Sequence, residues 1–307
     1  MANTPPTPRW DLSRIPDQTG RLAVVTGANT GLGYETALAL ADKGAQVVMA
    51  VRDLDKGRAA ARLITERVPG AAVSVQELDL SSLTSVRTAA KEIGDRHAAI
   101  DLLINNAGVS QSGNDRQKTK DGLELHLGTN HLGHFAFTGL LLGKILTAPA
   151  SRIVTVSSST HRTPRADQFD DLQWDVGYRA FAAYGRSKLA NLLFTYELQR
   201  KLAGTGSLVL AAHPGGSATE LMRNTPRPVR MLSELVLQSP AMGALPTLRA
   251  ATDPSALGGQ FYGPSGRRQL RGHPKIVTSS DRSYDLGLQQ RLWADSEALT
   301  GVEYPAA

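Results

Sequence analysis

The sequence of 307 residues contains no cysteine, and aromatic residues make up only 5% of it. The absence of cysteine excludes disulfides, thiolate metal ligands and cysteine nucleophiles. The scarcity of aromatic side chains leaves few groups on which nucleic-acid bases could stack. The formal net charge of +6 comes from basic residues that are scattered along the chain. We therefore expect no nucleic-acid partner, and small anionic molecules explain the charge more simply.

Long hydrophobic runs are also missing. No apolar stretch approaches the roughly 20 residues that a helix needs to cross a bilayer. Residues 1–8 are polar and rich in proline, and they lack the apolar core of a secretion signal. We therefore predict a cytoplasmic protein without a membrane anchor.

Short apolar runs alternate with helical patterns along most of the chain. The runs predict strands at 21–26, 45–51, 73–78, 100–105, 152–157, 208–212 and 258–262. The predicted helices cover 34–43, 53–68, 81–97, 121–146, a segment ending near 202, and 282–299. This alternation predicts an α/β fold, in which right-handed crossovers build a parallel sheet covered by helices on both faces.

A glycine-rich turn separates the first predicted strand from the first helix. Gly27, Gly31 and Gly33 have the spacing Gly-x-x-x-Gly-x-Gly. Glycines at such a place let the backbone approach a pyrophosphate, whose charge is favoured at a helix N-terminus. The turn is therefore a candidate dinucleotide site, and the alternative is a tight turn that binds nothing.

Tyr184 and Lys188 lie four residues apart and would stand on one face of a helix. A free phenol keeps its proton up to about pH 10, which is too high for acid–base chemistry near neutrality. A neighbouring ammonium favours the phenolate and would lower that pKa. The pair is a candidate catalytic group, although the same spacing also arises by chance in structural helices.

Further motifs follow in order and resemble those of the short-chain dehydrogenase/reductase family. The resemblance covers roughly residues 20–265 and includes Asp79-Leu80, Asn105-Asn106-Ala107-Gly108, Asn130, the serines Ser157-Ser158-Ser159, Tyr184 with Lys188, and Pro214-Gly215 followed by Thr219. The stretches 130–135, 187–192 and 52–57 look most like the retinol-dehydrogenase-like branch of that family.

The resemblance implies a single-domain, doubly wound Rossmann-type fold with about seven parallel strands in the order 3-2-1-4-5-6-7. It implies an N-terminal arm at 1–19, a domain for NADP binding and catalysis at 20–265, and a C-terminal extension at 266–307 that packs on the same domain. It also implies cofactor contacts from Gly27, Asn29, Thr30, Gly31, Leu32, Gly33, Arg52, Lys56, Asp79, Leu80, Asn106, Ala107, Gly108, Tyr184, Lys188, Pro214, Gly215 and Thr219.

The implied reaction is hydride transfer between nicotinamide and an alcohol or carbonyl carbon. Tyr184 would give or take the hydroxyl proton, and Lys188 would lower its pKa while holding the nicotinamide ribose. Asn130 would keep a water in a proton relay, and a serine would bind the substrate oxygen. Ser158 fits the family pattern best, with Ser157 and Ser159 as open alternatives.

The residue after the second strand favours NADP(H) over NAD(H). Enzymes that prefer NAD usually place an acid there to bind the ribose hydroxyls. Here the position is Arg52, and Lys56 lies a turn further on. A guanidinium suits a 2′-phosphate, although Arg52 could also be a solvated surface residue.

The substrate side is the least defined. Residues 160–177 and 217–238 are expected to build the pocket, and their apolar content favours a bulky apolar alcohol or carbonyl compound. Two alternatives are reduction of a C=C bond on a scaffold like that of protochlorophyllide reductase, and an NADP(H) sensor without catalysis. The missing cysteines oppose the first, and the presence of both Tyr184 and Lys188 opposes the second.

The histidines are not expected to bind metal. Packing or pocket lining is the interpretation for His126, His131 and His134, because no cysteine supports them and Glu124 is offset. His161 is predicted either to line the pocket or to be structural, and the same two readings apply to His213. The family resemblance further implies a homodimer or homotetramer built on the helices that precede and carry the tyrosine.

Overall fold

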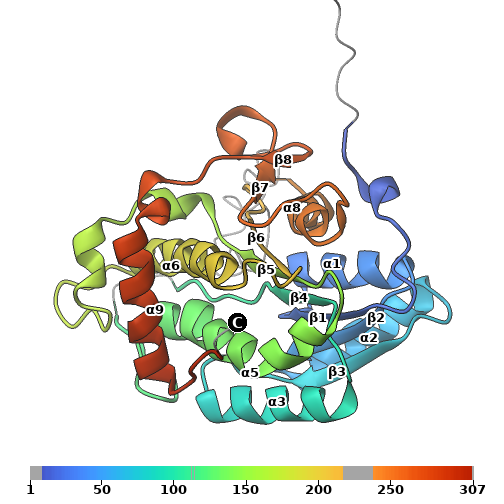
Figure 1. Ribbon diagram of the computed structural model, residues 1–307, viewed down its shortest axis with the longest axis horizontal. Coiled ribbons are helices and arrows are strands. Elements are labelled where there is room, and N and C mark those ends of the chain that lie inside the picture. Colours follow the sequence, from blue (N-terminus) through green and yellow to red (C-terminus); the bar gives the residue numbers. More distant parts are fainter. Residues whose placement is uncertain (1–8, 112, 114, 217–237, 306–307) are drawn as a thin grey trace, which may run out of the picture.

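One sheet of eight strands organises the computed structural model, which describes residues 9–111, 113, 115–216 and 238–305 (Figure 1). The strand order is β3-β2-β1-β4-β5-β6-β7-β8. The strands are β1 (Leu22–Thr26), β2 (Gln46–Val51), β3 (Val73–Glu77), β4 (Leu102–Asn105), β5 (Arg152–Val156), β6 (Leu208–Ala212), β7 (Phe261–Pro264) and β8 (Pro274–Ile276).

The first seven strands are parallel and have the predicted order, which confirms the doubly wound Rossmann-type fold. The seventh begins later than the predicted 258–262. The sequence analysis missed β8, which pairs antiparallel with β7 at the edge of the sheet. A strand of three residues that begins with proline carries no alternating pattern, and proline is tolerated there because edge strands leave backbone groups unpaired.

Helices cover both faces of the sheet. One face carries α1 (Gly31–Asp42), α2 (Leu54–Arg67) and α8 (Pro240–Thr252), and the other carries α3 (Leu83–Arg96), α5 (Gly133–Thr147) and α6 (Ala180–Lys201). Outside α5 and α6 lies α9 (Leu286–Thr300), drawn in red in Figure 1. The short helical turns are η1 (Leu12–Arg14), α4 (Leu125–Leu127), η2 (Gly128–Leu132), η3 (Ser159–Arg162), η4 (Ala166–Phe169), η6 (Arg267–Gln269) and η7 (Asp281–Tyr284).

Burial of the central strands on both sides explains their continuous apolar runs. In β1, Ala23 and Val25 pack into the core under α1 and α8, whereas Leu22 and Val24 pack into the core under α3 and α5. Successive side chains of a strand point to opposite faces, so a strand covered on both faces needs apolar residues at every position.

Side-chain caps fix several helix starts. The Ser82 hydroxyl accepts a hydrogen bond from the Ser85 amide at the start of α3. Asp53 accepts the Lys56 amide at the start of α2. Helix α9 ends at Gly301, whose φ of +60° suits a residue without a Cβ atom.

Two predicted helix boundaries are wrong. Helix α1 begins at Gly31, so the last two glycines of the turn already belong to its first turn. The predicted long helix at 121–146 is interrupted, because Lys118 and Glu124 form a bridge and the helical run starts only at Leu125. It then passes through η2, a π-helical turn that continues into α5. A π turn inserts one extra residue per turn, which a 3.6-residue pattern does not reveal.

An aromatic cluster attaches the C-terminal residues to α5. The Tyr304 hydroxyl donates to the Phe135 carbonyl at 2.7 Å, and the Tyr304 ring centroid lies 4.8 Å from that of Phe135 and 4.6 Å from that of Trp293. Helix α9 thus covers part of the face on which the family resemblance placed the contact between subunits. The oligomeric state stays a prediction, as do the domain boundaries at residues 19 and 265.

At the other end of the chain, Trp10 and Ile15 are buried against the core that also holds α1. Within the described parts of the chain, no helix combines the length and the apolar character needed to cross a membrane.

The packing of Tyr304 on α5 can be tested with two glycines of that helix. A Cβ at Gly139 would lie 2.7 Å from a Tyr304 ring carbon, whereas one at Gly143 would meet nothing within 4 Å. Alanine is better than glycine inside a helix by roughly 0.5–1 kcal/mol, so we expect Gly143→Ala to stabilise the protein by about that amount. We expect Gly139→Ala to destabilise it by about 1 kcal/mol, because overpacking costs more than the helix gains. Urea denaturation measures both, and equal stabilisation would contradict the packing.

Candidate active site

A cleft of about 650 Å³ opens at the carboxyl ends of the strands around β1. Strand β1 pairs with β2 on one side and with β4 on the other, so the cleft lies where the strand order reverses. Ligands of open α/β sheets bind at such a switch point. The lining contains these predicted cofactor residues: Gly27, Asn29, Thr30, Gly31, Leu32, Gly33, Arg52, Lys56, Asp79, Leu80, Asn106, Ala107 and Gly108.

The glycine turn presents the N-terminus of α1 to this cleft. Gly27 and Gly31 have φ values of +66° and +55°, which residues with side chains rarely adopt. A Cβ at Gly33 would overlap the Gly27 carbonyl and lie 2.6 Å from the Asn106 side-chain nitrogen. Thr30, at the N-cap position of α1, makes no side-chain cap hydrogen bond. The first amides of α1 therefore lack the usual side-chain acceptor, and a pyrophosphate fits that place.

Buried hydrogen bonds connect the start of the glycine turn to the segment that follows β4. The amides of Asn106 and Ala107 donate to the Thr26 hydroxyl, and the Asn106 side chain donates to the Thr26 carbonyl. His134 Nδ1 lies 3.0 Å from the Asn130 carbonyl, which can only accept, so Nδ1 carries the proton and Nε2 accepts from Thr26. Burial lowers the pKa of His134 to about 4, which keeps the ring neutral.

Charged residues line the adenosine end of the cleft. Arg52 is exposed, and the Lys56 ammonium lies 2.6 Å from the Asp53 carboxylate. Asp79 accepts from the Ser81 amide and hydroxyl and pairs with Lys120 at 2.9 Å. Burial acts to raise the pKa of Asp79, but these hydrogen bonds outweigh it and the net pKa is below its ordinary value.

Beside the cleft, the structure brings the four predicted catalytic residues close to one another, although none of them is among its lining residues. Tyr184 lies next to the hydroxyl of Ser158, which follows β5. The Lys188 ammonium lies 5.7 Å from the Tyr184 ring centroid and donates to the Val156 carbonyl. A Cβ at Gly108 would be 3.3 Å from both Lys188 Nζ and Asn130 Oδ1. This glycine therefore lets the floor of the cleft pass close to both polar groups.

The proton affinities differ from the sequence-based expectation. Burial raises the pKa of Tyr184 to about 12, and the neighbouring Ser158 hydroxyl lowers it only in part. Burial lowers the pKa of Lys188 to about 8. The expected fall in the pKa of the phenol is thus not seen, because desolvation of the phenolate exceeds its stabilisation by neighbours.

Asn130 owes its orientation to the π turn η2. Its side-chain oxygen accepts from the Val109 amide, and its side-chain nitrogen donates to the Val109 carbonyl and to the Ser187 hydroxyl. Both ends of the amide are therefore used to hold the segment that follows Gly108 against α6.

The three serines after β5 have different environments. Ser157 is buried and donates to the Lys188 carbonyl at 2.7 Å. Ser158 is half-buried, contacts Tyr184 and accepts from the Thr160 amide. Ser159 is the first residue of η3. The geometry thus leaves Ser158 as the serine beside the phenol, while its role stays a prediction.

The histidines are engaged in hydrogen bonds, and no group of potential metal ligands occurs among the described residues. His131 Nε2 bonds with the Ser296 hydroxyl of α9. His161 donates to the Ser158 carbonyl and accepts from the Ser280 amide, and His213 lies 2.9 Å from Gln269. The Glu124 carboxylate lies 3.0 Å from His126 Nδ1.

Some predicted residues lie elsewhere, and others were missed. Tyr184 and Lys188 are not among the residues that line the cleft. Nor are Pro214 and Gly215, which follow β6, and Thr219 falls outside the described residues. Thr129 lines the cleft, and its buried hydroxyl has no hydrogen-bond partner among the described residues. The sequence signal that could have identified Thr129 as a lining residue is its position just before Asn130. The other missed lining residues are Ala50, Asp53, Leu78, Val109 and Ser110.

This fold and this cleft agree with the known proteins that the chain resembles. Residues 21–170 match the short chain dehydrogenase family. The chain is 40% identical to human retinol dehydrogenase 13 over 298 residues, which are 94% of this chain and 86% of that protein. It therefore belongs to the short-chain dehydrogenase/reductase family of oxidoreductases.

The similarity to retinol dehydrogenases places the chain in the retinol-dehydrogenase-like branch of that family. Zebrafish polyprenol dehydrogenase is 38% identical, with 95% of this chain and 90% of that protein covered. The solved structure of an uncharacterised protein from Mycobacterium paratuberculosis has 42% identity and a TM-score of 0.79, covering 97% of this chain and all of that one. A solved structure from Beutenbergia cavernae, described as a putative NAD(P)-dependent gluconate 5-dehydrogenase with NADP bound at low occupancy, has 26% identity and a TM-score of 0.62. The match covers 80% of this chain and 95% of that one.

The different environments of two neighbouring serines give a stability test. Ser157→Ala removes a buried hydrogen bond to the Lys188 carbonyl and should cost about 1 kcal/mol of unfolding free energy. Ser158→Ala should cost less than half as much, because its hydroxyl is half-buried and accepts only a long 3.3 Å bond from the Thr160 amide. Urea denaturation compares the two, and a larger loss for Ser158→Ala would contradict this assignment.

Proposed function

We propose that the protein is an NADP(H)-dependent oxidoreductase that moves a hydride between nicotinamide and a bulky apolar alcohol or carbonyl compound. The observation that carries this proposal is the proximity of Ser158, Tyr184 and Lys188 to one another beside Gly108, which lines the cleft. A phenol, a hydroxyl and an ammonium are the groups that proton transfer to a carbonyl oxygen requires.

The residues of the cleft fit a dinucleotide phosphate. The uncapped N-terminus of α1 suits the pyrophosphate, and the exposed guanidinium of Arg52 suits a 2′-phosphate. Lys56 adds positive charge near that position, although Asp53 partly offsets it. The related gluconate 5-dehydrogenase structure with bound NADP supports the same cofactor here. When bound, the cofactor supplies or accepts the hydride.

In the reducing direction, Tyr184 gives its proton to the substrate oxygen while the Ser158 hydroxyl orients that oxygen. The phenolate that remains is favoured by the ammonium of Lys188, which is largely protonated near neutral pH since its pKa is about 8. Asn130 holds the segment after Gly108 in place. We propose that it also keeps the water of the relay that returns a proton to Tyr184. Oxidation of an alcohol runs through the same groups in reverse.

The substrate class is proposed from the relatives. Retinol and polyprenol, which their names give as substrates, are long apolar alcohols. Of the segment 217–238, only Gln238 lies among the described residues. In the segment before α6, Phe169 is buried in a core cluster with Leu127 and Leu189.

The acid–base role of Tyr184 is tested by Tyr184→Phe. We expect kcat for NADPH-dependent reduction of apolar aldehydes to fall at least ~10²-fold, because the proton donor is lost. NADPH fluorescence titration should give an unchanged Kd. Tyr196→Phe is the matched control, since Tyr196 lies in the same helix but hydrogen-bonds with Ser279. Near-normal turnover of Tyr184→Phe would contradict the mechanism. If the wild type binds NADPH without turnover of any compound, an NADP(H) sensor is favoured instead.

The preference for NADP(H) is tested by Arg52→Ala. Loss of a charge-assisted contact with the 2′-phosphate should lower the ratio of kcat/KM for NADPH over NADH by about 10–100-fold, the equivalent of roughly 1.5–3 kcal/mol. Arg58→Ala is the control, because Arg58 is exposed on α2, pairs with Asp55 and does not line the cleft. An unchanged ratio in Arg52→Ala would reject the assignment.

A further inference from the structure

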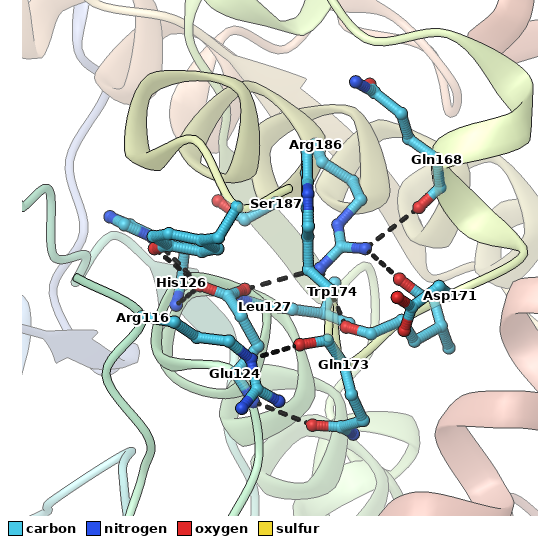
Figure 2. Close-up of polar contacts among 12 residues, drawn as sticks. Arg116, Glu124, His126, Leu127, Gln168, Asp171, Gln173, Trp174, Arg186 and Ser187 are labelled. Carbon is cyan, nitrogen blue, oxygen red and sulfur yellow. Dashed lines mark hydrogen bonds and ion pairs between the residues drawn. The ribbon is translucent and has the colours of Figure 1, made fainter. Parts of the chain in front are cut away.

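Three ionisable side chains that take no part in the proposed reaction are fully buried beside Tyr184. Glu124, His126 and Arg186 are each 0% exposed, and Figure 2 shows them converging between α4 and α6. Charges in a protein interior are costly unless they are paired and hydrogen-bonded. The contacts of these three side chains show which segments of the chain they connect.

Arg186 fastens the loop that precedes its own helix. We name residues 166–178 the pocket loop. The guanidinium donates to the carbonyls of Gln168, Asp171 and Leu172 at 2.6–2.9 Å. Its carbon atom lies 4.6 Å from the centroid of the Trp174 ring, a stacking contact in the same loop. A single side chain thus fixes both the backbone and a bulky side chain of the pocket loop (Figure 2).

Glu124 supplies the negative charge and a second attachment. Its carboxylate lies 3.5 Å from Arg186 and accepts from the amides of His126 and Leu127. Burial acts to raise the pKa of Glu124, but hydrogen bonds from the His126 ring and these amides outweigh it and keep the pKa below its ordinary value. The backbone amide of Glu124 donates to the Gln173 side chain, which ties the pocket loop to the start of α4.

His126 extends the network to the other side of Tyr184. Its Nε2 accepts from the Gln111 amide at 3.1 Å, so the ring proton is on Nδ1, which lies 3.0 Å from the Glu124 carboxylate. The hydroxyl of Tyr178 in the pocket loop lies 3.3 Å from the same carboxylate oxygen. The His126 ring meets the Tyr184 ring at 6.1 Å in an edge-to-face arrangement.

The network therefore connects two segments that flank the phenol. One is the pocket loop, and the other is the segment 109–111, whose first residue Val109 lines the cofactor cleft. We propose that Arg186 and Glu124, acting through His126, are positioning residues that fix these two segments beside Tyr184 and thereby set which carbonyl compounds reach it. This inference rests on the proposed function, since it concerns the substrate selectivity of the same site.

Arg186→Lys is the informative variant. It keeps a positive charge near Glu124, but an ammonium does not reproduce the planar fork that holds three carbonyls and stacks on Trp174. We expect kcat/KM for a bulky apolar aldehyde to fall about tenfold, within the range that pocket contacts contribute to specificity. For a short aldehyde, kcat/KM should stay within about twofold, because such a substrate does not reach the pocket loop. Hydrogen–deuterium exchange of the pocket-loop amides should become faster.

His131→Gln is the matched control. His131 is equally buried and lies five residues from His126, but it bonds with Ser296 on α9 and not with the pocket loop. It should lower the melting temperature without changing the ratio of kcat/KM between the two aldehydes. Should Arg186→Lys fail to fold, Gln173→Ala removes the acceptor of the Glu124 amide and should change that ratio in the same direction.

Equal losses for short and bulky aldehydes, or unchanged exchange in the pocket loop, would overturn the inference. The exchange measurement does not depend on turnover. If the wild type reduces no aldehyde, the proposed function fails by itself, and faster exchange in Arg186→Lys would still support the anchoring of the pocket loop.

Discussion

The cleft depends on one topological constraint, the pairing of β1 with β2 on one side and with β4 on the other. The chain leaves the ends of β1 and β4 toward opposite faces of the sheet. No connection between strands therefore crosses over the carboxyl end of β1. The space that remains receives the N-terminus of α1 and the Asn106-Ala107-Gly108 segment. Glycine at 27, 33 and 108 then lets three backbone segments approach so closely that a Cβ atom would collide or crowd its neighbours.

Buried polar groups hold the site in one arrangement. Thr26, His134 and Asn130 form a neutral chain beneath the cofactor cleft, whereas Glu124 and Arg186 form a charged pair beneath the proposed substrate side. Each group is hydrogen-bonded, so the desolvation cost of its burial is offset and any displacement leaves a partner unsatisfied. Such networks fix positions more strongly than apolar packing does, because hydrogen bonds are directional. The two networks meet at α6, which carries Tyr184 between them.

Sequence reasoning was reliable wherever the signal is local. The glycine turn and the Asn-Asn-Ala-Gly segment are short motifs, and the strand order was implied by the family resemblance that such motifs carry. The predicted residues from Gly27 to Gly108 line one cleft. It failed where a partner lies far along the chain. The π turn at Asn130 and the contact of Glu124 with Arg186 join segments that no periodic pattern relates. The pKa of Tyr184 was misjudged for the same reason, since burial is a property of the whole packing.

The sequence by itself determined the class of fold, the family and the glycine-rich turn, because these depend on backbone conformations and apolar patterns that a few neighbouring residues specify. Only the tertiary structure decided which serine lies beside Tyr184 and which groups Arg186 contacts. Those answers depend on distances between side chains from different elements. Such distances arise only when burial forces polar groups to find partners inside the fold.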